Sequence, residues 1–215
     1  MSEESDKRRK RTIGYLGLWK VDVDLHEVPV LVADEVVLRS SEAVCAHAVA
    51  LCLLALKGQG LSQLETFAFA DAYGVWDALD ATETDFILDM EPSGAAVLQY
   101  AWRYEGLHAL EWALGLNNHL VFPVDTVDPA RALELCIERI ATRSGDELPQ
   151  LRSAKELLDA IDVARCLEAI SATAAAQALP PPADMHPGVV FERNDALNWI
   201  ITPPTPFRRV ERRSR

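Results

Sequence analysis

The segment SGAAVLQYAWRYEGLHALEWALGL, residues 93–116, decides the fold class of this chain. Turned through about 100° per residue, as in an α-helix, its apolar side chains cover most of the circumference. Only one arc is suited to water, and it carries Tyr100, Tyr104, His108 and Glu111. A helix that is apolar on most sides is usually buried among other helices. The segment therefore predicts a central buried helix at about 93–116.

Two charged residues interrupt the apolar faces of this segment. Arg103 and Glu105 both fall between apolar side chains when the segment is drawn as a helix. A buried charge without a partner is strongly destabilising or changes its protonation state. Each of the two is therefore expected to have an ionic partner or to face a wet cleft.

Six other segments carry helical patterns and end signals. Ser153-x-x-Glu156 is a capping box, and Asp128-Pro129 places an N-cap before proline at the first helical position. The predicted helices span residues 40–57, 61–73, 82–90, 129–142, 153–176 and 189–201. Residues 12–38 mix short apolar pieces with acids and proline, which favours an extended arm. These patterns predict an all-α multi-helix fold with an N-terminal extended arm.

Composition indicates one globular domain with charged ends. The chain has 215 residues, of which 49% are hydrophobic and 25% charged, as in ordinary globular proteins. No shift in composition divides it in two. We predict a disordered basic N-terminus at residues 1–11, a single helical domain at 12–202 and a flexible basic tail at 203–215.

The formal charge of −12 is unevenly distributed. The two basic ends hold ten of the 21 cations, so residues 12–207 keep 11 cations against 29 acids, about −18. A body this acidic argues against a nucleic-acid surface, which needs clustered cations. It favours a basic protein partner. The basic ends are interpreted as solvated tails, with contact to nucleic acid or lipid as the alternative.

The cysteines and the N-terminus indicate a cytoplasmic protein. No C-x-x-C pair is present, and buried free thiols in a reducing compartment are expected at Cys45, Cys52, Cys136 and Cys166. The N-terminus is polar and has no secretory signal. The longest apolar run, Val44–Leu56, is interrupted by His47, so no membrane span is expected.

Four stretches resemble a known family. They are LRSSEAVCAHAVAL (38–51), AWRYEGLHALEWALGL (101–116), LRSAKELLDAIDVARCLEAI (151–170) and FERNDALNWII (191–201). In order and spacing they resemble the uncharacterised bacterial family DUF4272. The resemblance implies a mostly helical cytosolic domain and implies no activity.

Charged residues on apolar helix faces form the candidate binding site. It comprises Arg39, Arg103, Glu105, Arg165, Glu168 and Arg193. One interpretation is a cleft whose guanidinium groups bind an anionic ligand. The other, which the charge count favours, is an internal ion-pair network in which Asp162 or Glu192 supplies a further acid.

Other chemistry has little support in the sequence. Glu105-x-x-His108 has the spacing of helical di-iron sites, but those sites need a second such pair. The chain lacks the G-x-S-x-G, P-loop, G-x-G-x-x-G and H-E-x-x-H motifs. His47 is interpreted as a core histidine bonded to a carbonyl. No catalytic residue, cofactor or metal is therefore predicted.

The functional hypothesis is a non-enzymatic protein-interaction module with an acidic surface, as in immunity or inhibitor proteins. The alternative is a small anionic-ligand binder or an enzyme that uses the Arg/Glu cluster. The sequence makes no prediction of the oligomeric state.

Overall fold

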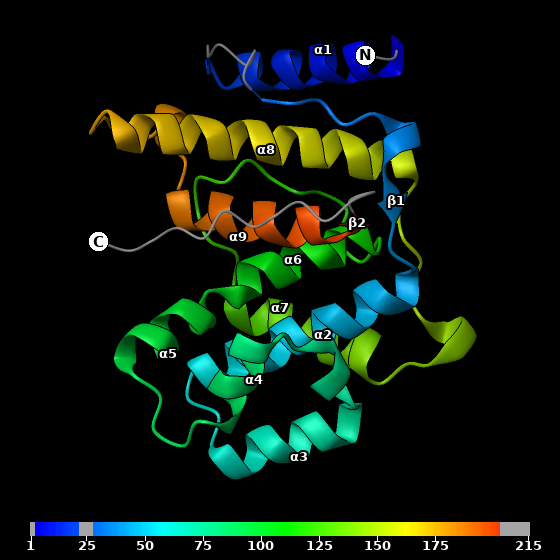
Figure 1. The fold of residues 1–215 in the computed structure, drawn as a ribbon, viewed down its shortest axis with the longest axis vertical. Coiled ribbons are helices and arrows are strands. Elements are labelled where there is room, and N and C mark those ends of the chain that lie inside the picture. Colours follow the sequence, from blue (N-terminus) through cyan, green and yellow to red (C-terminus); the bar gives the residue numbers. More distant parts are fainter. Residues whose placement is uncertain (1–2, 22–27, 203–215) are drawn as a thin grey trace.

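The computed structural model describes residues 3–21 and 28–202, which are mostly helical (Figure 1). The predicted all-α class is confirmed. The α-helices are α1 (Glu3–Leu18), α2 (Ser41–Gly58), α3 (Gln63–Tyr73), α4 (Ala81–Leu88), α5 (Gly94–Ala101), α6 (Arg103–Ala113), α7 (Pro129–Cys136), α8 (Ala154–Ala176) and α9 (Pro187–Trp199). Shorter 3-10 turns are η1 (Ala33–Glu35), η2 (Val75–Ala78), η4 (Gly145–Glu147) and η5 (Pro182–Asp184), and η3 (Ile137–Ala141) is a π-helical turn. The strands β1 (Val37–Leu38) and β2 (Ile201–Thr202) pair antiparallel, with Val37 opposite Thr202.

The helix α2 is enclosed on nearly every side by the fold. The helices α5, α6 and α7 pack against it, and its side chains from Val44 to Ala55 are almost all buried. Ser40 caps its first turn by accepting a hydrogen bond from the Ala43 backbone N–H at 3.2 Å. By length and composition α2 is apolar enough to cross a membrane, and 72% of that stretch is buried inside the protein.

The segment predicted as one central helix is two helices. The helix α5 ends at Ala101, and α6 begins at Arg103 after a turn at Trp102. At Gly58 of α2 the backbone of Ala101 lies so close that a Cβ atom would clash with it. Because the chain turns at Trp102, α5 packs against α2 at this contact, and α6 packs against both α2 and α9. Only α6 is deeply buried, since Leu98 on α5 is 63% exposed.

The arc predicted to face water on this segment is mostly buried. Tyr100, Tyr104 and Glu111 are 6%, 9% and 0% exposed. Tyr100 stacks on Phe86 of α4, with ring centroids 4.1 Å apart, and Asn117 from the following loop bonds Glu111. The prediction was wrong because the surrounding loops and α4 cover this side of the helices.

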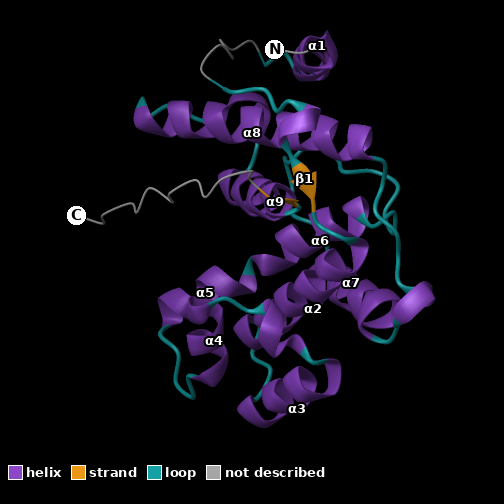
Figure 2. Ribbon diagram, turned by 45° about the vertical axis from the view of Figure 1, so that its right-hand side comes forward, coloured by secondary structure: helices purple, strands orange, loops and turns teal. Residues whose placement is uncertain are grey.

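The N-terminus is a helix where disorder was predicted for residues 1–11. The helix α1 packs across α8, and Figure 2 shows α1 end-on where α8 is seen from the side. Arg9 pairs with Asp162 at 2.9 Å, and Arg11 pairs with Asp159 at 2.6 Å. Asp159 and Asp162 are three residues apart and therefore share one face of α8. The residues that pair with α1 lie about 150 positions further along the chain. Of the predicted extended arm at 12–38, residues 12–18 are helical and residues 22–27 lie outside the described residues.

Figures 1 and 2 both show α1, α8 and α9 as successive layers above α6 and α2. A second, smaller apolar cluster joins the upper layers, formed by Leu16, Val21, Phe122, Cys166, Leu167, Ile170, Met185 and Val190. Residues 1–2 of the predicted disordered N-terminus, and the predicted flexible tail at 203–215, lie outside the described residues.

Candidate functional site

The buried ion pair between Glu105 and Arg193 fastens α6 to α9. The Arg193 Nε donates to Glu105 Oε2 at 3.0 Å, and Nη2 lies 2.9 Å from the same oxygen. The other carboxylate oxygen accepts the Val127 backbone N–H at 2.7 Å, and Arg193 Nη1 donates to the Val121 carbonyl at 2.8 Å. Both residues are almost inaccessible, at 0% and 4% exposed. For these two residues the structure shows the internal pairing that the charge count favoured.

Arg103 reaches different partners from Glu105, although they are only two residues apart. Its Nη1 lies 3.0 Å from Glu192 Oε2 and 3.4 Å from Asp195 Oδ2. Side chains two positions apart on a helix point about 200° apart. Arg103 therefore makes a second, separate link between α6 and α9.

The remaining predicted site residues lie elsewhere. Arg39 donates from Nε to the Trp199 carbonyl at 2.8 Å, and its guanidinium lies 4.2 Å from the Trp199 ring centroid. Arg165 donates from Nε to Asn198 Oδ1 at 2.5 Å. Glu168 is half-buried on α8. The structure thus brings Glu105 and Arg193 together, whereas Arg39, Arg103 and Arg165 bond other partners.

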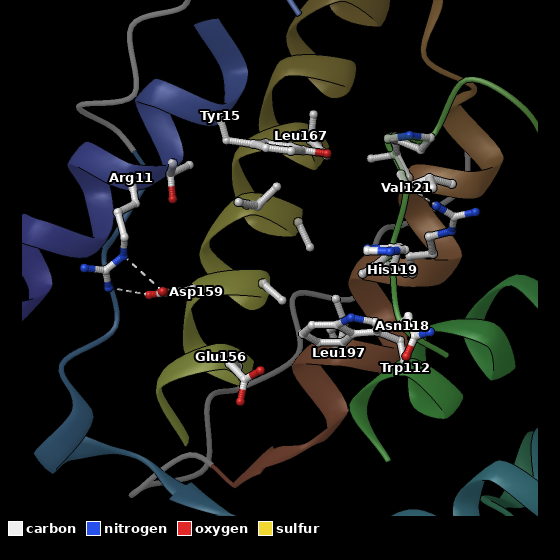
Figure 3. A pocket seen from close by; sticks show the side chains of 18 residues that line it. Arg11, Tyr15, Trp112, Asn118, His119, Val121, Glu156, Asp159, Leu167 and Leu197 are labelled. Carbon is white, nitrogen blue, oxygen red and sulfur yellow. Dashed lines mark hydrogen bonds and ion pairs between the residues drawn. The ribbon is translucent and has the colours of Figure 1, made fainter. Parts of the chain in front are cut away.

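A cleft of about 420 Å³ lies between α1, α8, α9 and the loop at 118–123 (Figure 3). Tyr15 of α1 and Trp112 of α6 stand toward its two ends. Its walls are mostly aliphatic, from Leu120, Val121, Pro123, Ala160, Val163, Ala164, Leu167, Val190 and Leu197. The sequence did not predict this cleft.

The spacing of small side chains on α8 explains the cleft. Ala160, Val163, Ala164 and Leu167 follow the i, i+3, i+4, i+7 pattern and so share one face. Two of these four residues are alanine, which leaves space where longer side chains would fill the gap between helices. The α1–α8 ion pairs hold α1 against this side of α8.

Most charged groups at the rim of the cleft already have partners. Arg11 is held by Asp159, and Glu156 accepts from Ser153 in the capping box of α8. Thr12 donates to Asp162 at 2.6 Å. Figure 3 shows the Arg11–Asp159 pair on the α1 side and His119 on the opposite side. Within the described residues, the side chains of Asn118 and His119 have no hydrogen-bond partner, so this loop offers polar groups to a ligand.

Two titratable groups beneath the loop have strongly shifted pKa values. Burial raises the pKa of Glu111 to about 8, although Asn117 donates to its Oε2 at 3.1 Å. Burial and the nearby Arg193 lower the pKa of His108 to about 4. Among residues 3–21 and 28–202, Glu111 Oε1 and His108 Nε2 have no hydrogen-bond partner. Among the described residues, no group of three or more His, Cys, Asp or Glu side chains is placed to hold a metal ion.

The four cysteines and His47 occupy the places that the sequence predicted. All four thiols are free and buried, and burial raises the pKa of Cys45 to about 11 and of Cys166 to about 12. His47 is 7% exposed, as expected for a core histidine, and its ring stacks on Trp199 with centroids 3.9 Å apart. These thiols are poor nucleophiles, because the reactive form is the thiolate.

The family comparison agrees with the resemblance in the sequence. The family described as Domain of unknown function (DUF4272) matches residues 8–208, so the chain belongs to this family. No curated protein and no solved structure matches the chain. The family description assigns no activity.

Proposed function

We propose that this member of the DUF4272 family binds a small, largely uncharged molecule with an apolar body in the cleft between α1, α8 and α9. The observation that carries the proposal is a hollow of about 420 Å³ with mostly apolar walls from separate parts of the chain. Binding sites for small molecules are typically clefts of roughly 300–1,000 Å³ with apolar walls and a few polar groups. Its volume and lining match that description.

The charges around the cleft support an uncharged ligand. Arg193 is neutralised by Glu105, and Arg11 by Asp159. An anion would have to displace one of these carboxylates, which would leave a charge without its partner. The polar part of the ligand would instead meet Asn118 and His119, which can donate and accept hydrogen bonds. The anionic-ligand hypothesis for the Arg/Glu cluster gains no support from this arrangement.

The acidic interaction module stays a prediction. One observation is relevant to it: the acids Asp159 and Asp162 already bind the basic helix α1 of the same chain. A basic partner would therefore need other acidic residues of the surface, or would have to compete with α1. A pull-down whose yield falls with salt is the test of that hypothesis.

The cleft proposal is tested with N-phenyl-1-naphthylamine, an uncharged apolar dye whose fluorescence rises in apolar surroundings. The expected result is saturable binding at one site per chain. Ala160→Leu adds side-chain volume to the wall and is expected to weaken binding at least tenfold. Ala172→Leu makes the same change on an exposed position of α8 and is the matched control. Equal affinity of both variants, or no saturable binding by the wild-type chain, would overturn the proposal.

A further inference from the structure

The Trp112 end of the cleft is held by a residue that does not itself line the cleft. Trp112 lies near the end of α6, and the loop that follows carries Asn118 and His119. Arg152 directly precedes the N-cap of α8 and bonds both the end of α6 and the start of this loop. It therefore joins three parts of the chain that meet at this end of the cleft.

Arg152 donates hydrogen bonds to backbone carbonyls on both sides of the turn that follows α6. Its Nε donates to the Trp112 carbonyl at 2.7 Å, and its Nη2 donates to the Asn117 carbonyl at 2.7 Å. The Arg152 backbone N–H also donates to the Ala113 carbonyl at 2.8 Å. The last carbonyls of an α-helix lack partners within the helix, and a cation at this end interacts favourably with the helix dipole. Arg152 therefore fixes the end of α6 and the start of the loop.

The guanidinium group of Arg152 also lies over the Trp112 side chain. Its Cζ is 4.9 Å from the centroid of the Trp112 ring. The third nitrogen, Nη1, lies 3.3 Å from Glu156 Oε1, so each of the three guanidinium nitrogens has an acceptor. A planar group bonded in three directions has a fixed orientation. The position of the Trp112 ring therefore depends on Arg152.

We propose that Arg152 is the positioning residue of the cleft, which sets the Trp112 ring and the loop at Asn118 and His119 in the arrangement that receives the ligand. The inference rests on the proposed function and adds a residue outside the cleft wall. Figure 3 shows Trp112 and Asn118 at the same end of the cleft. Lysine cannot take this role, because its ammonium is a compact point charge without the planar fork that reaches two carbonyls and covers a ring.

Chemical rescue of the full chain tests the proposal. Arg152→Ala removes the guanidinium group and is expected to weaken binding of N-phenyl-1-naphthylamine at least tenfold, because charge-assisted hydrogen bonds that hold the wall are lost. Methylguanidinium chloride, added at constant ionic strength, is expected to restore most of the lost affinity. Tetramethylammonium chloride, which has no N–H donor, is expected to restore none. Unchanged affinity in Arg152→Ala, or equal rescue by the two salts, would overturn the proposal.

Two further variants separate the shape of the guanidinium group from its charge. Arg152→Lys keeps the charge and should bind the dye as weakly as Arg152→Ala does. Arg143→Ala is the matched control, because Arg143 forms an i, i+4 pair with Glu147, as Arg152 does with Glu156. It should bind the dye as the wild type does, with or without methylguanidinium. Wild-type affinity in Arg152→Lys, or equal losses in Arg143→Ala and Arg152→Ala, would contradict the assigned role.

A measurement without dye separates this inference from the proposed function. NMR order parameters of the Trp112 indole N–H and of the Asn118 and His119 backbone amides report the order of the cleft wall. They are expected to fall in Arg152→Ala and to recover with methylguanidinium, while those of the α2 amides stay unchanged. Unchanged order in Arg152→Ala would overturn the inference even where the wild type binds dye.

The two results together identify which statement fails. Loss and recovery of order at Trp112 and Asn118 in a chain whose wild type binds no dye would overturn the proposed function and support the positioning role of Arg152. Should Arg152→Ala fail to fold, Arg152→Lys carries both measurements, with loss of dye affinity and of order as the expected result and wild-type values as the contradiction.

Discussion

The α6–α9 contact and the α1–α8 contact are both held by arginine–carboxylate pairs, yet they differ in what surrounds the pairs. The Glu105–Arg193 pair is buried, and backbone groups bond Glu105 Oε1 and Arg193 Nη1. The Arg11–Asp159 pair between α1 and α8 is more open, since its side chains are 39% and 25% exposed. A small polar cavity of about 100 Å³ lies beside the first contact, whereas the larger apolar cleft lies beside the second. The charge pair at the α6–α9 contact is therefore sealed from solvent, whereas the pairs at the α1–α8 contact hold α1 beside an open cleft.

Breaking the sealed contact is expected to have the largest effect. Arg193→Leu leaves the Glu105 carboxylate buried without its cation, which should cost about 3–5 kcal/mol in the free energy of unfolding. Arg131→Leu, which removes an exposed pair with Glu134, should cost less than about 1 kcal/mol. Urea unfolding measures both. The double variant Glu105→Leu/Arg193→Leu should recover part of the loss; equal effects of Arg193→Leu and Arg131→Leu would contradict the distinction.

The buried Glu111 makes the closed core sensitive to pH. Burial raises its pKa to about 8 in the folded chain from an ordinary value of 4.5, so the folded state binds the proton more tightly. The contribution of Glu111 to the free energy of unfolding therefore does not change with pH below pH 4.5. It falls as the pH rises from 4.5 to 8, and above pH 8 the loss is complete. Glu111→Gln should be more stable than the wild type at pH 9, by about 2 kcal/mol or more, and similar to it at pH 4. Parallel unfolding curves across this range would refute the expectation.

The close approach of α2 and α5 should tolerate no added atom. Gly58→Ala would place a Cβ against the Ala101 backbone, and overpacking of this kind costs about 1–3 kcal/mol. Gly14→Ala in α1 meets nothing within 4 Å and should be neutral or stabilising by up to about 1 kcal/mol. Thermal unfolding of the two variants provides the comparison, and a stabilised Gly58→Ala would count against tight packing at this contact.

The smallest expected effect concerns salt. At 1 M salt the Debye length is about 3 Å, so the partly exposed pairs between α1 and α8 should weaken. Amide hydrogen exchange in α1 is expected to accelerate roughly fivefold to tenfold, a change of about 1 kcal/mol in the free energy of local opening. Amides of α2, which apolar packing encloses, serve as the internal control. Unchanged exchange in α1 would show that charge does not hold it.

Local signals predicted much of the fold. The capping box at Ser153 and Glu156 and the N-cap at Asp128 start α8 and α7 as expected, and Gly74 ends α3 with φ 61°. These features depend on residues within one turn of each other. At α4 the cap is Asp80, so the helix begins at Ala81, just before the predicted start at residue 82.

Features that depend on distant residues were not predicted. The helix α1 is ordered by acids about 150 residues away, and the turn at Trp102 accompanies the approach of Gly58. Because a buried charge needs a partner, the sequence correctly predicted one for Glu105, but it did not show which arginine that partner is. Arg103 and Glu105 point to different sides of α6 and bond different partners. The paired alanines on α8 were a signal for the cleft, but they indicate a hollow only once the helix opposite them is known.

The most direct test of the account is a crystal structure of the chain with N-phenyl-1-naphthylamine bound. The account predicts the dye between Tyr15 and Trp112, against Ala160 and Ala164, with the Arg11–Asp159 and Glu105–Arg193 pairs intact. Dye bound elsewhere, or a cleft that holds only ordered water at saturating dye, would contradict the claim that this layer of the fold is built to hold an apolar ligand.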